Sequence, residues 1–119
     1  MPDTSLPLHA WSAHALIHAY RQGHLSPVEV TQSVLDHIAQ WEPHLCASYL
    51  LRPELALMQA QASEARWLKG VPCGALDGVP VTIKENISTV GDPSPLGTLA
   101  MSLITPRTAT LSLRARACP

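Results

Sequence analysis

The chain has 119 residues, with eight Lys and Arg against nine Asp and Glu and a formal net charge of −1. This length allows one modest domain at most, or a piece of a larger one. A near-neutral chain lacks the basic stripe of a nucleic-acid binder and the basic face of a membrane-surface protein. The chain is 46% hydrophobic and 14% charged, with a mean hydropathy of +0.09, so we expect much of its surface to be buried against something.

Nothing in the sequence predicts export or membrane insertion. The N-terminal segment has neither the positively charged region nor the apolar run of a signal peptide. No stretch reaches the roughly 18 uninterrupted apolar residues that a membrane span requires. We therefore expect a cytoplasmic protein with no membrane partner and no nucleic-acid partner.

The first predicted helix covers residues 8–22, because apolar residues recur there at three- and four-residue steps. Gly23 follows, at the position where glycine commonly ends a helix. His14 and His18 on this helix have the i, i+4 spacing of a zinc pair, but they lie opposite its apolar face. The sequence lacks the H-E-x-x-H form and offers no evident third ligand, so we expect a solvated helix face and no metal site.

Two further helices are predicted. Ser26 and Glu29 form a capping box that starts the second helix, with a proline at its first position. We expect this helix to reach about Trp41, with Pro43 beyond its end. A third helix is expected over residues 53–70, where it ends at a glycine.

Glycine and proline punctuate the chain after the third helix. The segment GVPCGALDGVP (residues 70–80) opens as a loop, and residues 88–98 are again loop-like. Between them, residues 79–83 form a short run rich in β-branched residues and predict a strand. The glycines match no phosphate-binding pattern, and no serine lies in a G-x-S-x-G elbow.

Lys84 ends the predicted strand and precedes Glu85. A lysine that enters a core from a strand end loses hydration, which favours the neutral amine, the form that accepts a proton. Lys84 is therefore a candidate general base. The alternative is a surface lysine paired with Glu85 or Asp77.

The segment GALDGVPVTIKENI (residues 74–87) resembles the lysine-bearing motif of the amidase signature family. Residues 91–98 resemble the family's next loop, and residues 23–30 resemble its early helix pair. The likeness covers about residues 8–103. It implies an α/β fold, of which this chain holds the N-terminal helices and the first strand or strands of a mixed β-sheet.

The resemblance also implies a chemistry: hydrolysis or transfer of amide nitrogen by a Ser–cis-Ser–Lys triad that needs no metal and no organic cofactor. In that triad a neutral lysine accepts a proton from the bridging serine, which activates the nucleophilic serine, and Lys84 takes the base position. The family's Gly/Ser-rich segment with both serines lies well downstream of the lysine. No serine here matches it, since Ser88, Ser94, Ser102 and Ser112 lie outside any such segment. We therefore expect the chain to be inactive alone and its full-length parent to act on a small-molecule amide.

The last residues differ from the rest of the chain. Residues 93–119 contain three arginines and no acid, and residues 104–119 show no clear period. We expect residues 1–103 to be the N-terminal part of an amidase domain and residues 104–119 to be an atypical tail, produced by a frameshift near codons 103–107. A deliberately short noncatalytic product is the rival hypothesis.

Two other functions stay open at this point. The apolar helix faces fit a noncatalytic interaction module as well as they fit packing onto a sheet. The sequence before the serine region also does not separate a free-standing amidase from a fragment of the A subunit of a tRNA-dependent amidotransferase. The oligomeric state is not predicted.

Overall fold

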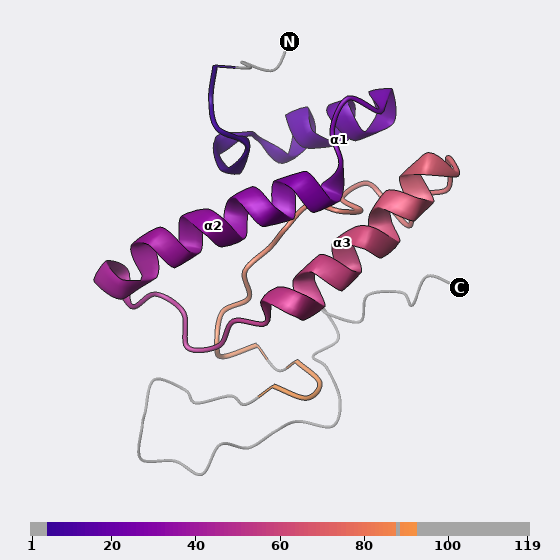
Figure 1. Cartoon of the computed structure of the whole chain (residues 1–119). Helices are drawn as coiled ribbons and strands as arrows, with labels where there is room; N and C mark the ends of the chain where they lie inside the picture. The colour runs from indigo at the N-terminus through magenta and orange to yellow at the C-terminus, as the bar shows by residue number, and fades with distance from the viewer. Residues whose placement is uncertain (1–4, 88, 93–119) are drawn as a thin grey trace. The chain divides into compact units, whose positions relative to one another are not determined.

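The computed structural model describes residues 5–87 and 89–92. Within these residues it contains a 3-10 turn and three α-helices, and no β-strand (Figure 1). Contacts divide the chain into a unit of residues 1–80 and a unit of residues 81–119. All three helices belong to the first unit. The predicted tail at 104–119 lies outside the described residues.

The first α-helix is shorter than the sequence predicts. A 3-10 turn, Leu8–Ala10, comes first, and α1 then covers Ala13–Gln22. Ser12 separates the two, because its backbone is extended and its side chain accepts a hydrogen bond from the N–H of Ala15 at 3.2 Å. The expected helix start at residue 8 is therefore wrong, because the N-cap Ser12 makes the α-helix begin at Ala13. Gly23 ends the helix with φ +67°, as predicted.

The capping box of the second helix is confirmed. Helix α2 covers Pro27–Leu45. Ser26 Oγ accepts a hydrogen bond from the backbone of Val28 at 3.0 Å, and the Ser26 N–H donates to Glu29 Oε2 at 2.8 Å. These reciprocal bonds satisfy N–H groups at the helix start that have no intrahelical partner.

Helix α2 continues past its predicted end. It passes Trp41 and includes Pro43, so the expectation that Pro43 lies beyond the helix is wrong. Proline lacks an N–H, yet near a C-terminal end it removes only one hydrogen bond of the ladder. The N–H of Cys46 still bonds the carbonyl of Glu42 at 2.9 Å and closes the last turn.

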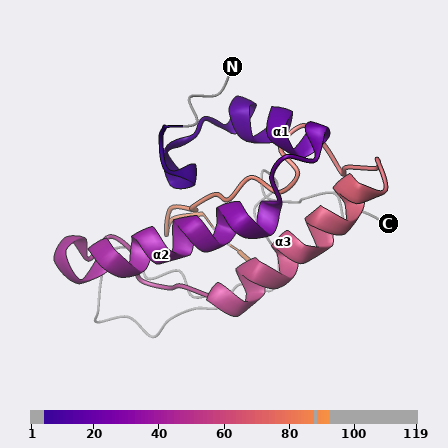
Figure 2. The same ribbon diagram turned by 45° about the horizontal axis from the view of Figure 1, so that its top comes forward.

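Helix α3, Pro53–Leu68, confirms the third prediction. It packs against α2 and runs antiparallel to it, as both views show (Figures 1 and 2). A side-chain hydrogen bond joins Ser26, before the start of α2, to Glu64, near the end of α3. The two helices therefore form a hairpin whose open end lies near Ser26.

A small apolar core joins α1 to α2. Its buried members are Leu16, Ile17 and Tyr20 from α1 and Val30 from α2. Partly buried residues pack around these four: Trp11, Leu25, Val34, Trp67 and Val79. The helical spacing of the apolar residues thus becomes one buried face on each helix, as the sequence pattern predicts.

Residues 79–83 do not form the predicted strand. A strand requires a neighbour that accepts its backbone hydrogen bonds, and no strand is present in the described residues. The α/β class expected from the resemblance is therefore not seen in this part of the chain, which is helical. After residue 83, the N–H of Ile87 bonds the carbonyl of Lys84 at 3.0 Å in a turn.

None of the helices described could cross a membrane. Helix α2 has 19 residues, but Glu29, Asp36 and Glu42 interrupt its apolar surface. Length alone does not make it a span.

Candidate functional site

The loop before the candidate lysine is held to α3 by one carboxylate. Asp77 Oδ2 accepts a hydrogen bond from Arg66 Nε at 2.8 Å, and Asp77 Oδ1 accepts one from Arg66 Nη2 at 2.6 Å. The Cys73 N–H donates to the same Oδ2 at 2.9 Å. The Asp77 side chain is only 5% exposed and that of Arg66 27%. A bidentate pair of this kind fixes orientation as well as distance.

The ion pair keeps Asp77 charged. The Arg66 guanidinium lowers the pKa of Asp77 to about 2, against the opposing effect of burial. The Cys73 N–H and the nearby Ser63 hydroxyl contribute to this lowering of the pKa, with smaller effects than Arg66. The pKa of Arg66 is raised by the same hydrogen bond. The pair therefore stays ionised at every physiological pH.

Two aromatic side chains bind the loop backbone. Trp67 Nε1 donates to the carbonyl of Asp77 at 3.1 Å, and the Tyr20 hydroxyl donates to the carbonyl of Gly78 at 3.2 Å. Burial raises the pKa of Tyr20, so its hydroxyl keeps the proton it donates. The loop is thus attached to both α1 and α3.

Both the backbone angle and the close surroundings of position 78 require a glycine there. Its φ is +83°, a backbone conformation that residues with a Cβ rarely adopt. A Cβ at this position would lie 2.6 Å from Ser63 Oγ and 2.8 Å from Pro27 Cγ. Ser63 and Pro27 are fully buried, so neither can move aside easily. We call Asp77 and Gly78, with their partners Tyr20, Arg66 and Trp67, the loop clamp.

Lys84 lies in the second unit, four residues after Pro80. Its side chain is exposed, so the burial expected of a strand-end lysine is not present in this chain. The alternative partner Asp77 is bound to Arg66. The four serines downstream of Lys84, Ser88, Ser94, Ser102 and Ser112, lie outside the described residues.

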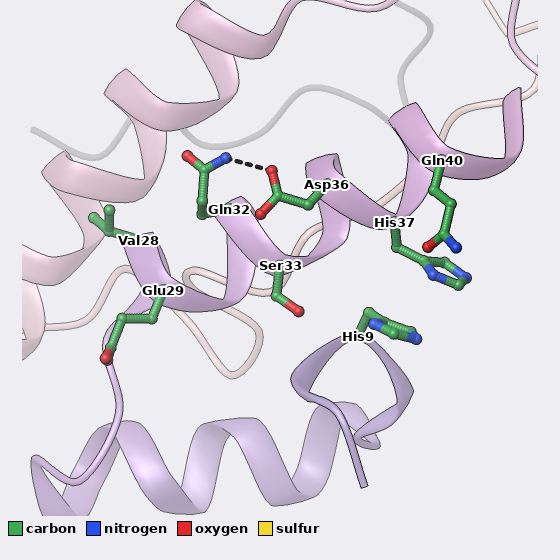
Figure 3. A pocket seen from close by; sticks show the side chains of 8 residues that line it. All are labelled: His9, Val28, Glu29, Gln32, Ser33, Asp36, His37 and Gln40. Carbon is green, nitrogen blue, oxygen red and sulfur yellow. Dashed lines mark hydrogen bonds between the residues drawn. The ribbon is translucent and has the colours of Figure 1, made fainter.

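A second feature is an open depression of about 650 Å³ along α2 (Figure 3). His9 from the 3-10 turn stacks on His37 from α2, with ring centroids 3.8 Å apart. Gln32 donates to Asp36 Oδ1 at 2.8 Å on the same side of the helix. No pattern in the sequence indicates the histidine stack, because the two residues are 28 positions apart and belong to different elements. The full lining is His9, Val28, Glu29, Gln32, Ser33, Asp36, His37 and Gln40.

The predicted solvated face of α1 carries His14 and His18, and both are exposed. They line a smaller depression of about 300 Å³ together with Arg21, Ala75 and Leu76. Among the described residues, no three His, Cys, Asp or Glu side chains come together in a way that could hold a metal ion.

One known protein family matches most of the chain. The sequence model of the amidase family matches residues 29–112, a range that includes Asp77, Gly78 and Lys84. The chain belongs to the amidase family. This confirms the resemblance that the residues around Lys84 carry.

Three curated relatives of this chain carry two kinds of name. The A subunit of the glutamyl-tRNA(Gln) amidotransferase of Chloroflexus aggregans is 38% identical over 90 residues, covering 76% of this chain and 18% of the relative. The mitochondrial protein of the same name from Rattus norvegicus is 41% identical over 73 residues, covering 61% and 14%. An indoleacetamide hydrolase from Bradyrhizobium diazoefficiens is 38% identical over 88 residues, covering 74% and 17%.

The chain therefore spans about one sixth of the length of the curated relatives it matches. An aligned segment of 88 residues within a chain of 119 necessarily includes Lys84, Asp77 and Arg66. No solved structure matches the chain.

Proposed function

We propose that this chain is the N-terminal part of an amidase domain in which Lys84 is the general base of a Ser–cis-Ser–Lys triad. The observation that carries the proposal is the family match across the segment GALDGVPVTIKENI, which ends three residues after Lys84. The parent enzyme cleaves a carbon–nitrogen bond of a small amide, in the cytoplasm and without a metal or organic cofactor.

In this mechanism the neutral Lys84 amine accepts a proton from the bridging serine. That serine in turn takes the proton of the nucleophilic serine, whose oxygen attacks the amide carbonyl. When the C–N bond breaks, the protonated Lys84 returns its proton through the bridging serine to the amide nitrogen, which leaves as ammonia or an amine. Water then attacks the acyl-enzyme, releases the carboxylic acid and restores the serine hydroxyl. Both serines lie well downstream of the lysine in the family's triad, and no serine of this chain matches either of them. The 119-residue chain by itself is inactive, because Lys84 has no nucleophile to activate.

The exposed position of Lys84 fits an incomplete domain. In the complete α/β domain, residues 79–83 form a strand that pairs with a neighbour and carries Lys84 into the core. The residues support this arrangement, because Val81 and Ile83 are 73% and 41% exposed here and have the branched side chains that strands favour. The loss of water around Lys84 on such burial favours its neutral form.

The A subunit of a glutamyl-tRNA(Gln) amidotransferase is the second candidate for the parent. The names of the relatives from Rattus norvegicus and Chloroflexus aggregans favour it. Hydrolysis and transfer share the acyl-enzyme step. They differ in the fate of the amide nitrogen, which is released as free ammonia in hydrolysis and passed to a second substrate in transfer. An assay that follows both ammonia release and amide formation on charged tRNA distinguishes the two candidates.

The test is a hybrid enzyme in which this chain's matching residues replace the 88-residue segment of the Bradyrhizobium indoleacetamide hydrolase. Ammonia release from indoleacetamide is measured for the hybrid and for two variants, Lys84→Ala and Lys69→Ala. Lys69 is an exposed lysine at the end of α3 and serves as the matched control. We expect Lys84→Ala to abolish turnover and Lys69→Ala to leave it unchanged. Equal turnover in both variants contradicts the proposal.

The boundary at residue 103 is a separate proposal. We propose that residues 104–119 result from a frameshift near codons 103–107. Resequencing the gene from codon 90 onward and translating all three frames tests this. A Gly/Ser-rich segment with both serines in another frame is the expected result, and its absence from every frame favours a short noncatalytic product.

A further inference from the structure

We propose that Asp77 is a positioning residue for Lys84: by holding the loop clamp together, it fixes the point from which the Lys84 segment extends. This inference rests on the proposed function of Lys84. It concerns a residue outside the triad, and its contacts lie within the three-helix unit.

The chain length between the clamp and Lys84 makes positioning possible. The clamp ends at Gly78, and Val79 packs against the core of α1 and α2. From Pro80 to Lys84 there are four residues, which span at most about 14 Å when extended. Any shift of the clamp therefore moves the origin of a short connection to the proposed base.

Asp77 is the residue on which the clamp depends most. Its side chain binds Arg66 and the Cys73 N–H, while its carbonyl accepts from Trp67. Arg66 and Trp67 belong to α3, and Cys73 belongs to the loop itself. In the same loop the N–H of Val79 bonds the carbonyl of Leu76 at 3.1 Å. Removing the negative charge leaves the partly buried Arg66 without its counter-ion.

The packing around Gly78 restricts the loop backbone to one position. Gly78 follows Asp77 with a positive φ and with Ser63 and Pro27 directly against it. The backbone has no room to slide toward α2 or α3. The bonds from the Asp77 carboxylate to Arg66 hold the loop against α3, so loosening this contact frees movement in the direction away from the helices.

The test uses the hybrid enzyme with Asp77→Asn, and with Asp36→Asn as the matched control. Asp36 is an exposed carboxylate on α2 whose oxygen bonds Gln32, an interaction that asparagine can keep. Activity is measured at a temperature where all variants are folded by circular dichroism. We expect Asp77→Asn to lower kcat about tenfold to a hundredfold, with KM within about twofold. The alkaline rise of kcat/KM is expected to shift as well, because the environment of Lys84 changes.

Each result separates the inference from the proposed function. If Lys84→Ala stays active, the proposed function is wrong and the inference with it. If Lys84→Ala is inactive but Asp77→Asn lowers only the melting temperature and leaves kcat and the pH profile unchanged, Asp77 is merely structural and the inference alone is overturned. Partial recovery of kcat in Asp77→Glu, which keeps the charge, supports positioning.

A second measurement keeps the inference testable if the substituted hybrid does not fold. In the 119-residue chain, hydrogen exchange is followed at the Trp67 indole N–H and the Val79 amide. We expect Asp77→Asn to speed exchange at both sites at least about tenfold, and Asp36→Asn to leave both rates unchanged. Equal rates in the two variants, or no protection in the unsubstituted chain, overturn the clamp.

Discussion

Arg66 and Asp77 form a two-bond ion pair that ties the loop before Lys84 to α3, with donor–acceptor distances of 2.8 and 2.6 Å. The residues are 11 positions apart, and Asp77 is nearly buried. Most surface ion pairs contribute little to stability, but this one is shielded from water on its acidic side.

Breaking this pair lowers stability. We expect Asp77→Asn to reduce the free energy of unfolding of the chain by about 2 kcal/mol, since a charge-assisted hydrogen-bond pair is lost and Arg66 keeps its charge. Urea unfolding followed by tryptophan fluorescence measures the change. A reduction no larger than that in the exposed control Asp36→Asn contradicts the clamp's contribution to stability.

The same pair predicts an acid dependence. The pKa of Asp77 is lowered in the folded chain to about 2, from an ordinary value of 3.8. Its contribution is therefore fully present above pH 3.8 and is lost as the pH falls from there through 2, up to about 2 kcal/mol in all. Unfolding of the wild-type chain and of Asp77→Asn is compared between about pH 2 and pH 6. The difference between them should shrink on acidification, and a constant difference argues against the lowered pKa.

Gly78 gives a prediction with an internal control. We expect Gly78→Ala to destabilise the chain by about 2 kcal/mol or more, because alanine disfavours φ +83° and its methyl group meets Ser63 and Pro27. Gly74 has open space around it and no positive φ, so Gly74→Ala should be nearly neutral. Thermal unfolding of both variants measures this. Equal effects would show that the loop does not lie against Ser63 and Pro27.

An exposed apolar set lies at the closed end of the α2–α3 hairpin. We expect the chain to bind a hydrophobic dye there and to self-associate, because contiguous apolar surface is rarely left uncovered. Leu45→Glu with Met58→Glu should reduce both signals in dye titration and sedimentation. A monomer that binds no dye would contradict this, and a defined complex with another protein would favour the interaction module. The set is Trp41, Leu45, Tyr49, Leu50, Leu51, Leu55 and Met58.

Local signals in the sequence predict the helices well and the clamp not at all. The capping box at Ser26 and Glu29 lies within four residues, so its geometry follows directly from the sequence. The bond from Tyr20 to Gly78 joins residues 58 positions apart, and no periodicity indicates it. Such contacts depend on how α1 and α3 pack, which local patterns do not specify.

The predicted strand shows a different limit. Residues 79–83 have the composition of a strand, but pairing depends on a neighbour that the described residues do not supply. Helix ends are a smaller limit of prediction from sequence. Near Ser12 and Pro43 the observed helix ends differ from the predicted ends by several residues. Only the sequence motif around Lys84 makes it a candidate, because its side chain is exposed and the structure shows no burial that would single it out.

Chemical rescue of the Lys84→Ala hybrid tests the proposed base most directly. Primary amines of increasing basicity are added, and the rate at which indoleacetamide is converted to the free acid is measured. If Lys84 accepts a proton in the reaction, small amines should restore turnover, and the rescued rate should rise with amine basicity. Full activity without any amine, or an inactive variant that no amine restores while the Lys69→Ala hybrid works normally, would contradict the assignment of Lys84 as the base.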